Sequence, residues 1–155
     1  MGYIDLYLAK AVQVIEGLGC HAIDEMVQLF VEACAQGGRL SVLGVGGSAA
    51  NASHAVNDFR KFAGMDAYMP VDNVAEFTAR INDEGWDTVY SEWLACSQLN
   101  DKDLVFVLSV GGAAASRISA QISYRHCNTP ARSGPEFMVS RDGTEVLPPR
   151  SPMTA

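Results

Sequence analysis

The sequence lacks the features that would place a protein in a membrane, on nucleic acid or in a secretory route. No apolar run in its 155 residues approaches the ~20 residues of a membrane span. The start, residues 1–5, has no basic signal-peptide cluster. Basic residues are few, 11 against 18 acidic, and the net charge of −7 argues against nucleic acid or an anionic membrane as partner. We expect a cytoplasmic protein.

Paired cysteines are missing as well. The four cysteines are scattered and form no C-x-x-C pair: Cys20, Cys34, Cys96 and Cys127. Cys34 falls on the apolar face of a predicted helix, so we expect reduced, partly buried thiols.

The chain is long enough for one domain with a sizeable core, and it changes character near Gly112. Residues 1–112 hold six basic and fifteen acidic side chains, whereas the last 43 residues hold five Arg against three acidic side chains. Five of the six prolines also lie in that last part, from Pro130 onward. We therefore divide the chain into an α/β domain over residues 1–112 and an atypical segment over residues 113–155.

Hydrophobic periodicity predicts alternating strands and helices. Helices are expected over residues 3–17, 23–34, 49–62, 74–81 and 86–99, strands over 39–43, 66–71 and 104–108, and a turn over 82–85. Residues 113–124 could form one more helix, and residues 125–155 show no helical or strand period. This order is typical of a doubly wound parallel sheet preceded by two helices, with its final strands incomplete. Ligands bind such sheets at the carboxyl ends of the strands.

A glycine loop follows the first predicted strand. The residues Gly44-Val45-Gly46-Gly47-Ser48-Ala49 join it to a helix start, which directs N–H groups and the helix dipole at an anion. The loop also satisfies the dinucleotide fingerprint, with Asp72 as the acidic residue, and a merely structural turn is the other alternative. We favour a phosphate or sugar phosphate, because Ser109-Val110-Gly111-Gly112 repeats the pattern after the third strand.

His54 and Asp58 lie one helical turn apart and can act together on a metal or a substrate. The alternative is a surface pair worth roughly 0.2–0.5 kcal/mol. The aromatic residues between Trp86 and Trp93 are better explained as core or subunit interface than as a substrate platform.

These motifs together resemble the sugar isomerase (SIS) family, and within it the phosphoheptose isomerases. The resemblance covers residues 1–112 and is carried by the glycine loop with His54 and Asp58, by Asp72-Asn73, by Asn82-Asp83-Glu84-Gly85 and by the loop from Ser109. It implies a flavodoxin-like three-layer fold with a five-stranded parallel sheet, whose leading helices pack in a homotetramer or other homo-oligomer.

The resemblance also implies a reaction, in which sedoheptulose 7-phosphate is isomerised through an enediolate. Gly46, Gly47 and Ser48 would contact the substrate, His54 would be a zinc ligand, and Asp58 would serve as base or ligand. The remaining sugar-phosphate contacts would be Asp72, Asn82, Asp83, Ser109, Val110, Gly111 and Gly112.

The chain departs from the family pattern at several positions. Val45 replaces the usual asparagine, Asp58 the usual glutamate, and the loop from Ser109 is poor in hydroxyls. The late helix with a Gln or Glu and a His, which completes the metal site, has no match in residues 113–155. We hypothesise a frame-shifted or altered C-terminal segment. The alternatives are a non-enzymatic SIS-domain adaptor, like the tetrameric protein that binds the bacterial replication initiator, and a dinucleotide enzyme.

Overall fold

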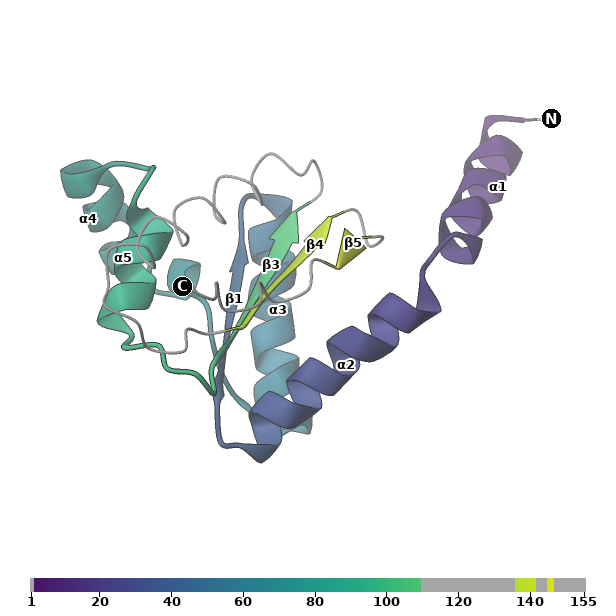
Figure 1. The fold of residues 1–155 in the computed structure, drawn as a ribbon. Helices are drawn as coiled ribbons and strands as arrows, with labels where there is room; N and C mark the ends of the chain where they lie inside the picture. Colours follow the sequence, from purple (N-terminus) through teal and green to yellow (C-terminus); the bar gives the residue numbers. More distant parts are fainter. Residues whose placement is uncertain (1, 110–135, 142–144, 147–155) are drawn as a thin grey trace, which may run out of the picture.

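Two helices lead into an α/β body in the computed structural model, which describes residues 2–109, 136–141 and 145–146 (Figure 1). The elements are α1 (Tyr3–Glu16), α2 (Cys20–Ala35), β1 (Arg39–Gly44), α3 (Gly47–Phe62), β2 (Asp66–Tyr68), the 3-10 helix η1 (Pro70–Asp72), α4 (Val74–Glu84), α5 (Val89–Cys96), β3 (Leu104–Ser109), β4 (Glu136–Arg141) and β5 (Glu145–Val146). The predicted helix over residues 113–124 lies outside the described residues.

The strands form one sheet in the order β2-β1-β3-β4-β5. β1 pairs in parallel with β2 and β3, β3 pairs in parallel with β4, and β5 is antiparallel to β4. The chain leaves β1 toward β2 on one side and returns to β3 on the other, so the direction of winding reverses between β1 and β3. This is the topological switch point where ligands bind in doubly wound sheets, and the predicted fold class is confirmed.

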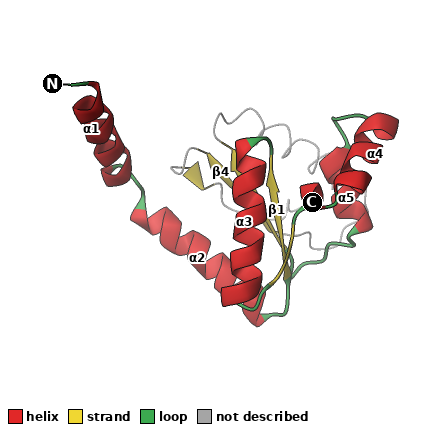
Figure 2. Ribbon diagram, turned by 180° about the vertical axis from the view of Figure 1, so that it is seen from behind, coloured by secondary structure: helices red, strands yellow, loops and turns green. Residues whose placement is uncertain are grey.

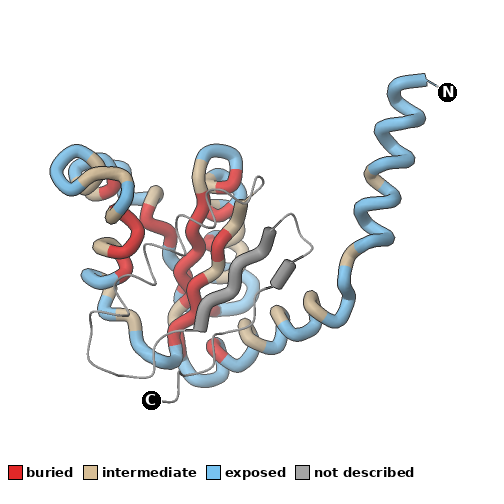
Figure 3. Tube along the Cα trace, turned by 45° about the horizontal axis from the view of Figure 1, so that its top comes forward, coloured by how far each residue is buried: buried red, intermediate tan, exposed pale blue. Residues whose placement is uncertain are grey.

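The sheet buries both faces, because β1 alternates its side chains between two core clusters. Leu40 and Val42 pack with Ala52 and Val56 of α3 on one face. Leu43 packs on the other face in the cluster formed with α4 and α5. Figure 2 shows α3 against one side of the sheet and α4 and α5 on the side away from α3. Buried residues run along the central strands in Figure 3.

The leading helices extend away from this body (Figure 1). α1 has no buried residue, and Ile4, Leu8 and Ile15 on its apolar stripe expose 65%, 56% and 66% of their surface. In α2, Ala33 near the C-terminal end is the buried residue, while Val27 and Val31 are exposed. The amphipathic pattern that predicted both helices is therefore present. In α2, Leu29 and Phe30 pack against the core cluster that contains Ala33, whereas the apolar side chains named in α1 are exposed.

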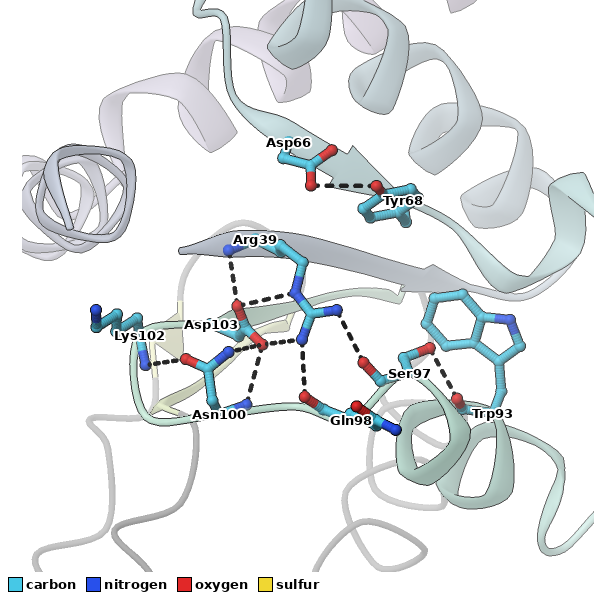
Figure 4. Close-up of polar contacts among 9 residues, drawn as sticks. All are labelled: Arg39, Asp66, Tyr68, Trp93, Ser97, Gln98, Asn100, Lys102 and Asp103. Carbon is cyan, nitrogen blue, oxygen red and sulfur yellow. Dashed lines mark hydrogen bonds and ion pairs between the residues drawn. The ribbon is translucent and has the colours of Figure 1, made fainter. Parts of the chain in front are cut away.

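At the amino edge of the sheet, a polar cluster joins β1 to β3 (Figure 4). The carboxylate of Asp103 accepts from the backbone N–H of Arg39 at 2.8 Å, from its Nε at 3.2 Å and from the side chain of Asn100 at 3.0 Å. The guanidinium of Arg39 also donates to the carbonyls of Ser97 and Gln98, both at 2.8 Å. The cluster fixes the chain after α5 against the start of the central strand.

Several local predictions are corrected by the structure. Cys20, Cys34 and Cys96 are free but exposed, not partly buried, and Cys127 lies outside the described residues. The turn expected over residues 82–85 is instead the last turn of α4, which ends at Gly85 with φ +92°. β2 is shorter than predicted because Pro70 begins a 3-10 turn.

The C-terminal segment also holds strand structure that its composition did not predict. β4 and β5 lie within residues 125–155, where no strand was expected. The apolar part of β4 is short and lies among Pro, Arg and Ser residues, so the sequence pattern for a strand is weak there. The strand is stabilised by its pairing with β3. None of the helices in the described ranges is long and apolar enough to cross a membrane.

Candidate functional site

The two predicted ligand loops begin at the same edge of the sheet. β1 and β3 are neighbours in parallel register, with Gly44 opposite Leu108, so the glycine loop and Ser109 leave the sheet side by side. Ser109 is half-buried at the end of β3. Val110, Gly111 and Gly112, the rest of the second loop, lie outside the described residues. The structure thus brings together the starts of both loops, as the sequence predicted.

The glycine loop turns sharply from β1 into α3. Gly46 caps α3 with φ +61°, a conformation that side chains rarely adopt, and its carbonyl accepts from the N–H groups of Ala49 and Ala50. At Gly44 an added Cβ would lie 2.6 Å from the carbonyl oxygen of Ser48, whereas at Gly47 it would meet nothing within 4 Å. Two glycines are therefore required by the turn itself, and Gly47 leaves open space at the helix start.

Ser48 and Asp72 lie on elements that adjoin this loop. Ser48 is in the first turn of α3 and is 6% exposed. Asp72, in η1 after β2, accepts from the hydroxyl of Ser53 at 2.8 Å, which joins η1 to α3. Ser53 was not among the predicted site residues; its position one residue before His54, on the helix that starts at the loop, was the available signal.

Asn82 and Asp83 lie elsewhere. Both are exposed in the last turn of α4, and the side-chain amide of Asn82 donates to the carboxylate of Asp83 at 2.8 Å. Across the described ranges, no hydrogen bond joins either side chain to the glycine loop. Their predicted contact with substrate stays a prediction.

His54 and Asp58 pair on α3 as their spacing predicted. The imidazole Nε2 lies 3.4 Å from the carboxylate Oδ2, and the two side chains are 78% and 44% exposed. The other carboxylate oxygen accepts from Asn57 at 3.2 Å. Both groups are therefore accessible to a ligand from solvent.

This pair matches part of a zinc site. In a tetrahedral zinc site with bonds of about 2.0–2.1 Å, neighbouring ligand atoms lie about 3.3 Å apart, close to the 3.4 Å between His54 and Asp58. No group of three or more His, Cys, Asp or Glu that could hold a metal occurs in the part of the chain that the structure describes. The pair fits two of four ligand positions, and zinc stays a prediction.

Tyr90 holds the start of the glycine loop by a hydrogen bond, a role that was not predicted from the sequence. Its hydroxyl, on α5, donates to the carbonyl of Gly44 at 2.9 Å, and the residue is 1% exposed. Burial raises the pKa of Tyr90 to about 12, so the hydroxyl keeps its proton at neutral pH. The available signal in the sequence was a tyrosine at a position expected in the core, because a buried phenol hydroxyl needs a hydrogen-bond partner.

A pocket lies at the amino edge of the sheet, at the opposite end of the strands from this site. It is lined by residues of α2 and of the turn before β3, among them Leu29, Glu32, Lys102 and Leu104. None of the predicted site residues lines it, so the candidate site is the carboxyl edge.

Comparisons with known proteins identify the family and the fold. The SIS domain family model matches residues 6–129, and the chain belongs to that family. Its fold is similar to that of a phosphoheptose isomerase from Francisella tularensis, with 21% identity, a TM-score of 0.74 and coverage of 91% of this chain and 75% of that one. A phosphoheptose isomerase from Neisseria gonorrhoeae is similar at 18% identity, with a TM-score of 0.72 and coverage of 89% and 72%. No curated protein shows significant similarity to the sequence.

Proposed function

We propose that this chain is a sugar-phosphate isomerase of the SIS family and that its substrate is sedoheptulose 7-phosphate. The observation that carries the proposal is the shared edge: the glycine loop after β1 and Ser109, the last residue of β3, lie on neighbouring strands where the winding reverses. Glycine-lined turns at strand ends expose backbone N–H groups to a phosphate. The similarity in fold to two phosphoheptose isomerases supports this choice of substrate.

The proposed chemistry is an aldose–ketose isomerisation. A base removes a proton from C1 of the ketose while O2 gains one, which gives an enediol; O1 then loses its proton as C2 gains one, which gives the aldose. Asp58 is the candidate base, because its carboxylate is accessible beside His54 on the helix that starts at the glycine loop. Backbone N–H groups of the loop would stabilise the oxyanion.

Turnover of sedoheptulose 7-phosphate, with and without added zinc, tests the proposal. Asp58→Asn keeps the shape of the side chain but removes the base, so activity should fall by at least about 100-fold. Asp101→Asn is the matched control, because Asp101 is an exposed carboxylate in the turn before β3, at the other edge of the sheet. Equal activity in Asp58→Asn and the wild type would contradict the role of Asp58.

A second candidate is a module that binds a sugar phosphate without turning it over. It is favoured by the metal donors, because His54 and Asp58 supply two ligand positions and the described residues supply no third. This candidate predicts calorimetric binding of sedoheptulose 7-phosphate by a protein that shows no turnover at any zinc concentration. Turnover by the wild type would contradict it, and the absence of both binding and turnover would contradict both candidates.

We also propose that α1 and α2 mediate self-association. α1 exposes Ile4, Leu8, Val12 and Ile15, a stripe at helical spacing, and α2 exposes Val27 and Val31. A stripe of this kind is stable in water when it packs against another apolar surface. A second copy of the chain presents the same stripe, so the contact can be self-complementary.

A further inference from the structure

We propose that Tyr90 is a positioning residue that holds the glycine loop in its ligand-ready shape. The inference rests on the proposed function for the identity of the ligand, but the geometry of the loop carries it independently. The contact of interest is the hydrogen bond from the Tyr90 hydroxyl to the carbonyl of Gly44, the last residue of β1. No other residue of α5 is seen to donate a side-chain hydrogen bond to this loop within the described ranges.

The ring of Tyr90 is itself fixed in place. It lies 5.5 Å from the ring of Phe77 and 6.1 Å from that of Trp86, and those two rings are 6.1 Å apart in an edge-to-face arrangement. The cluster joins α4 to the start of α5 and belongs to the larger core on that face of the sheet. Because these rings are packed against one another, the Tyr90 hydroxyl is held in a fixed position next to the carbonyl of Gly44.

The loop is anchored to this same core at the next residue. Val45, which follows Gly44, packs against the cluster that contains Tyr90. Two consecutive loop residues are thus held by this core, Gly44 by the hydrogen bond from Tyr90 and Val45 by apolar packing.

A change in the position of Gly44 also changes the position of the residues on the ligand side of the loop. Gly44 approaches the backbone of Ser48 so closely that no Cβ fits between them. A shift of Gly44 therefore moves the first turn of α3, where the N–H of Ser48 bonds to Val45 and that of Ala49 to Gly46. These are the amides that border the proposed phosphate and sugar contacts, so Tyr90 acts on ligand binding through the loop and does not touch the ligand.

The test compares two variants that each lose one buried hydroxyl from α5. Tyr90→Phe removes the bond to Gly44 and keeps the ring. Ser91 is 5% exposed, and Ser91→Ala removes a hydroxyl that donates to the carbonyl of Thr88, the residue before α5, at 2.8 Å; among the described residues this hydroxyl makes no hydrogen bond to the loop. For wild type and both variants we would measure the thermal midpoint, hydrogen exchange at Ser48, Ala49 and Ala50, and calorimetric affinity for sedoheptulose 7-phosphate.

The expected result is a specific effect of Tyr90→Phe. Exchange at the three loop amides should be about 2- to 10-fold faster than in wild type and the affinity about 2- to 10-fold weaker, the range for one hydrogen bond. Ser91→Ala should match the wild type in both. If Tyr90→Phe leaves loop exchange unchanged, if both variants change it equally, or if Tyr90→Phe fails to fold while Ser91→Ala folds, the inference is overturned.

The two proposals fail separately in this experiment. If wild type binds no sedoheptulose 7-phosphate, the proposed function fails, while faster exchange confined to the loop of Tyr90→Phe still supports the positioning role. If wild type binds and Tyr90→Phe binds equally well with unchanged loop exchange, the proposed function stands and the positioning role is wrong.

Discussion

Arg39 and Asp103 close the amino edge of the sheet by pairing the first residue of β1 with the residue before β3. The carboxylate of Asp103 is 1% exposed and accepts from both the backbone and the guanidinium of Arg39, whose side chain is 30% exposed. Burial alone would raise the pKa of Asp103, but hydrogen bonds from Arg39 and Asn100 outweigh it, and the net pKa is lowered. The folded state therefore favours the ionised carboxylate.

Asp103→Asn should lower the free energy of unfolding by about 2–4 kcal/mol, because it leaves a half-buried guanidinium without its anion. In wild type the contribution of this pair is fully present above the ordinary Asp pKa of 3.8 and is lost as the pH falls through the lowered pKa. Urea unfolding at pH 7 and at steps below pH 4 measures both effects.

The control for this pair is Asp101→Asn, an exposed carboxylate two residues earlier. It should change stability by less than about 1 kcal/mol. An Asp103→Asn protein that is as stable as Asp101→Asn would show that the cluster in Figure 4 contributes nothing measurable.

Two glycines of the loop should respond differently to alanine. Gly44→Ala places a Cβ 2.6 Å from the carbonyl oxygen of Ser48, so the loop or α3 must shift, at a cost of at least about 2 kcal/mol. Gly47→Ala meets open space and should stay within about 1 kcal/mol of wild type, because alanine favours the helix. Thermal unfolding of both proteins checks the difference, and equal losses would refute this reading of the turn.

The zinc prediction can be tested with two histidines of similar geometry. His54 pairs with Asp58 on α3 at 3.4 Å, and His21 pairs with Glu25 on α2 at 3.5 Å. If the α3 pair holds zinc, His54→Ala should weaken zinc binding by at least about tenfold, and His21→Ala should not. Competition with a chromogenic chelator gives the affinities. Equal affinity in both variants would remove zinc from this site.

Self-association through the leading helices should depend on their apolar stripe. Leu8 is 56% exposed in the single chain and would be buried in the oligomer. Leu8→Asp places a carboxylate at this position, so the sedimenting mass should fall toward that of one chain. Gln13→Asp adds the same charge at an exposed polar position of α1 and should leave the mass unchanged. A wild type that sediments as a monomer would contradict the proposal.

Most of the central fold could be predicted because the local sequence pattern of each element indicates how far its residues are buried. Leu104 to Leu108 are apolar on both faces, as a strand buried between helix layers must be, and the strand is β3. Asn73, a residue type that commonly caps helices, precedes α4, and its side chain accepts from the N–H of Glu76. The parallel pairing of β1 with β3 then brings Gly44 and Ser109, where the two predicted loops start, to one edge of the sheet.

Features that depend on distant contacts could not be predicted in the same way. The strand at residues 136–141 gains its identity from pairing with β3, about thirty residues earlier in the chain, and its own composition is mixed. The role of Tyr90 follows from a contact 46 residues away in sequence. Asn82 and Asp83 resemble turn residues in isolation, but Gly85 ends the helix only after them.

The six-residue length of β1 separates two tasks. At about 3.3 Å per residue the strand holds Arg39 and Gly44 about 17 Å apart, so the ionic cluster at one end and the ligand loop at the other share no side chain. Free-energy changes at sites this far apart add. A protein engineer could therefore exchange loop residues such as Gly47 to accept a different phosphorylated compound, and could reinforce the Arg39 end to offset whatever stability the new loop loses.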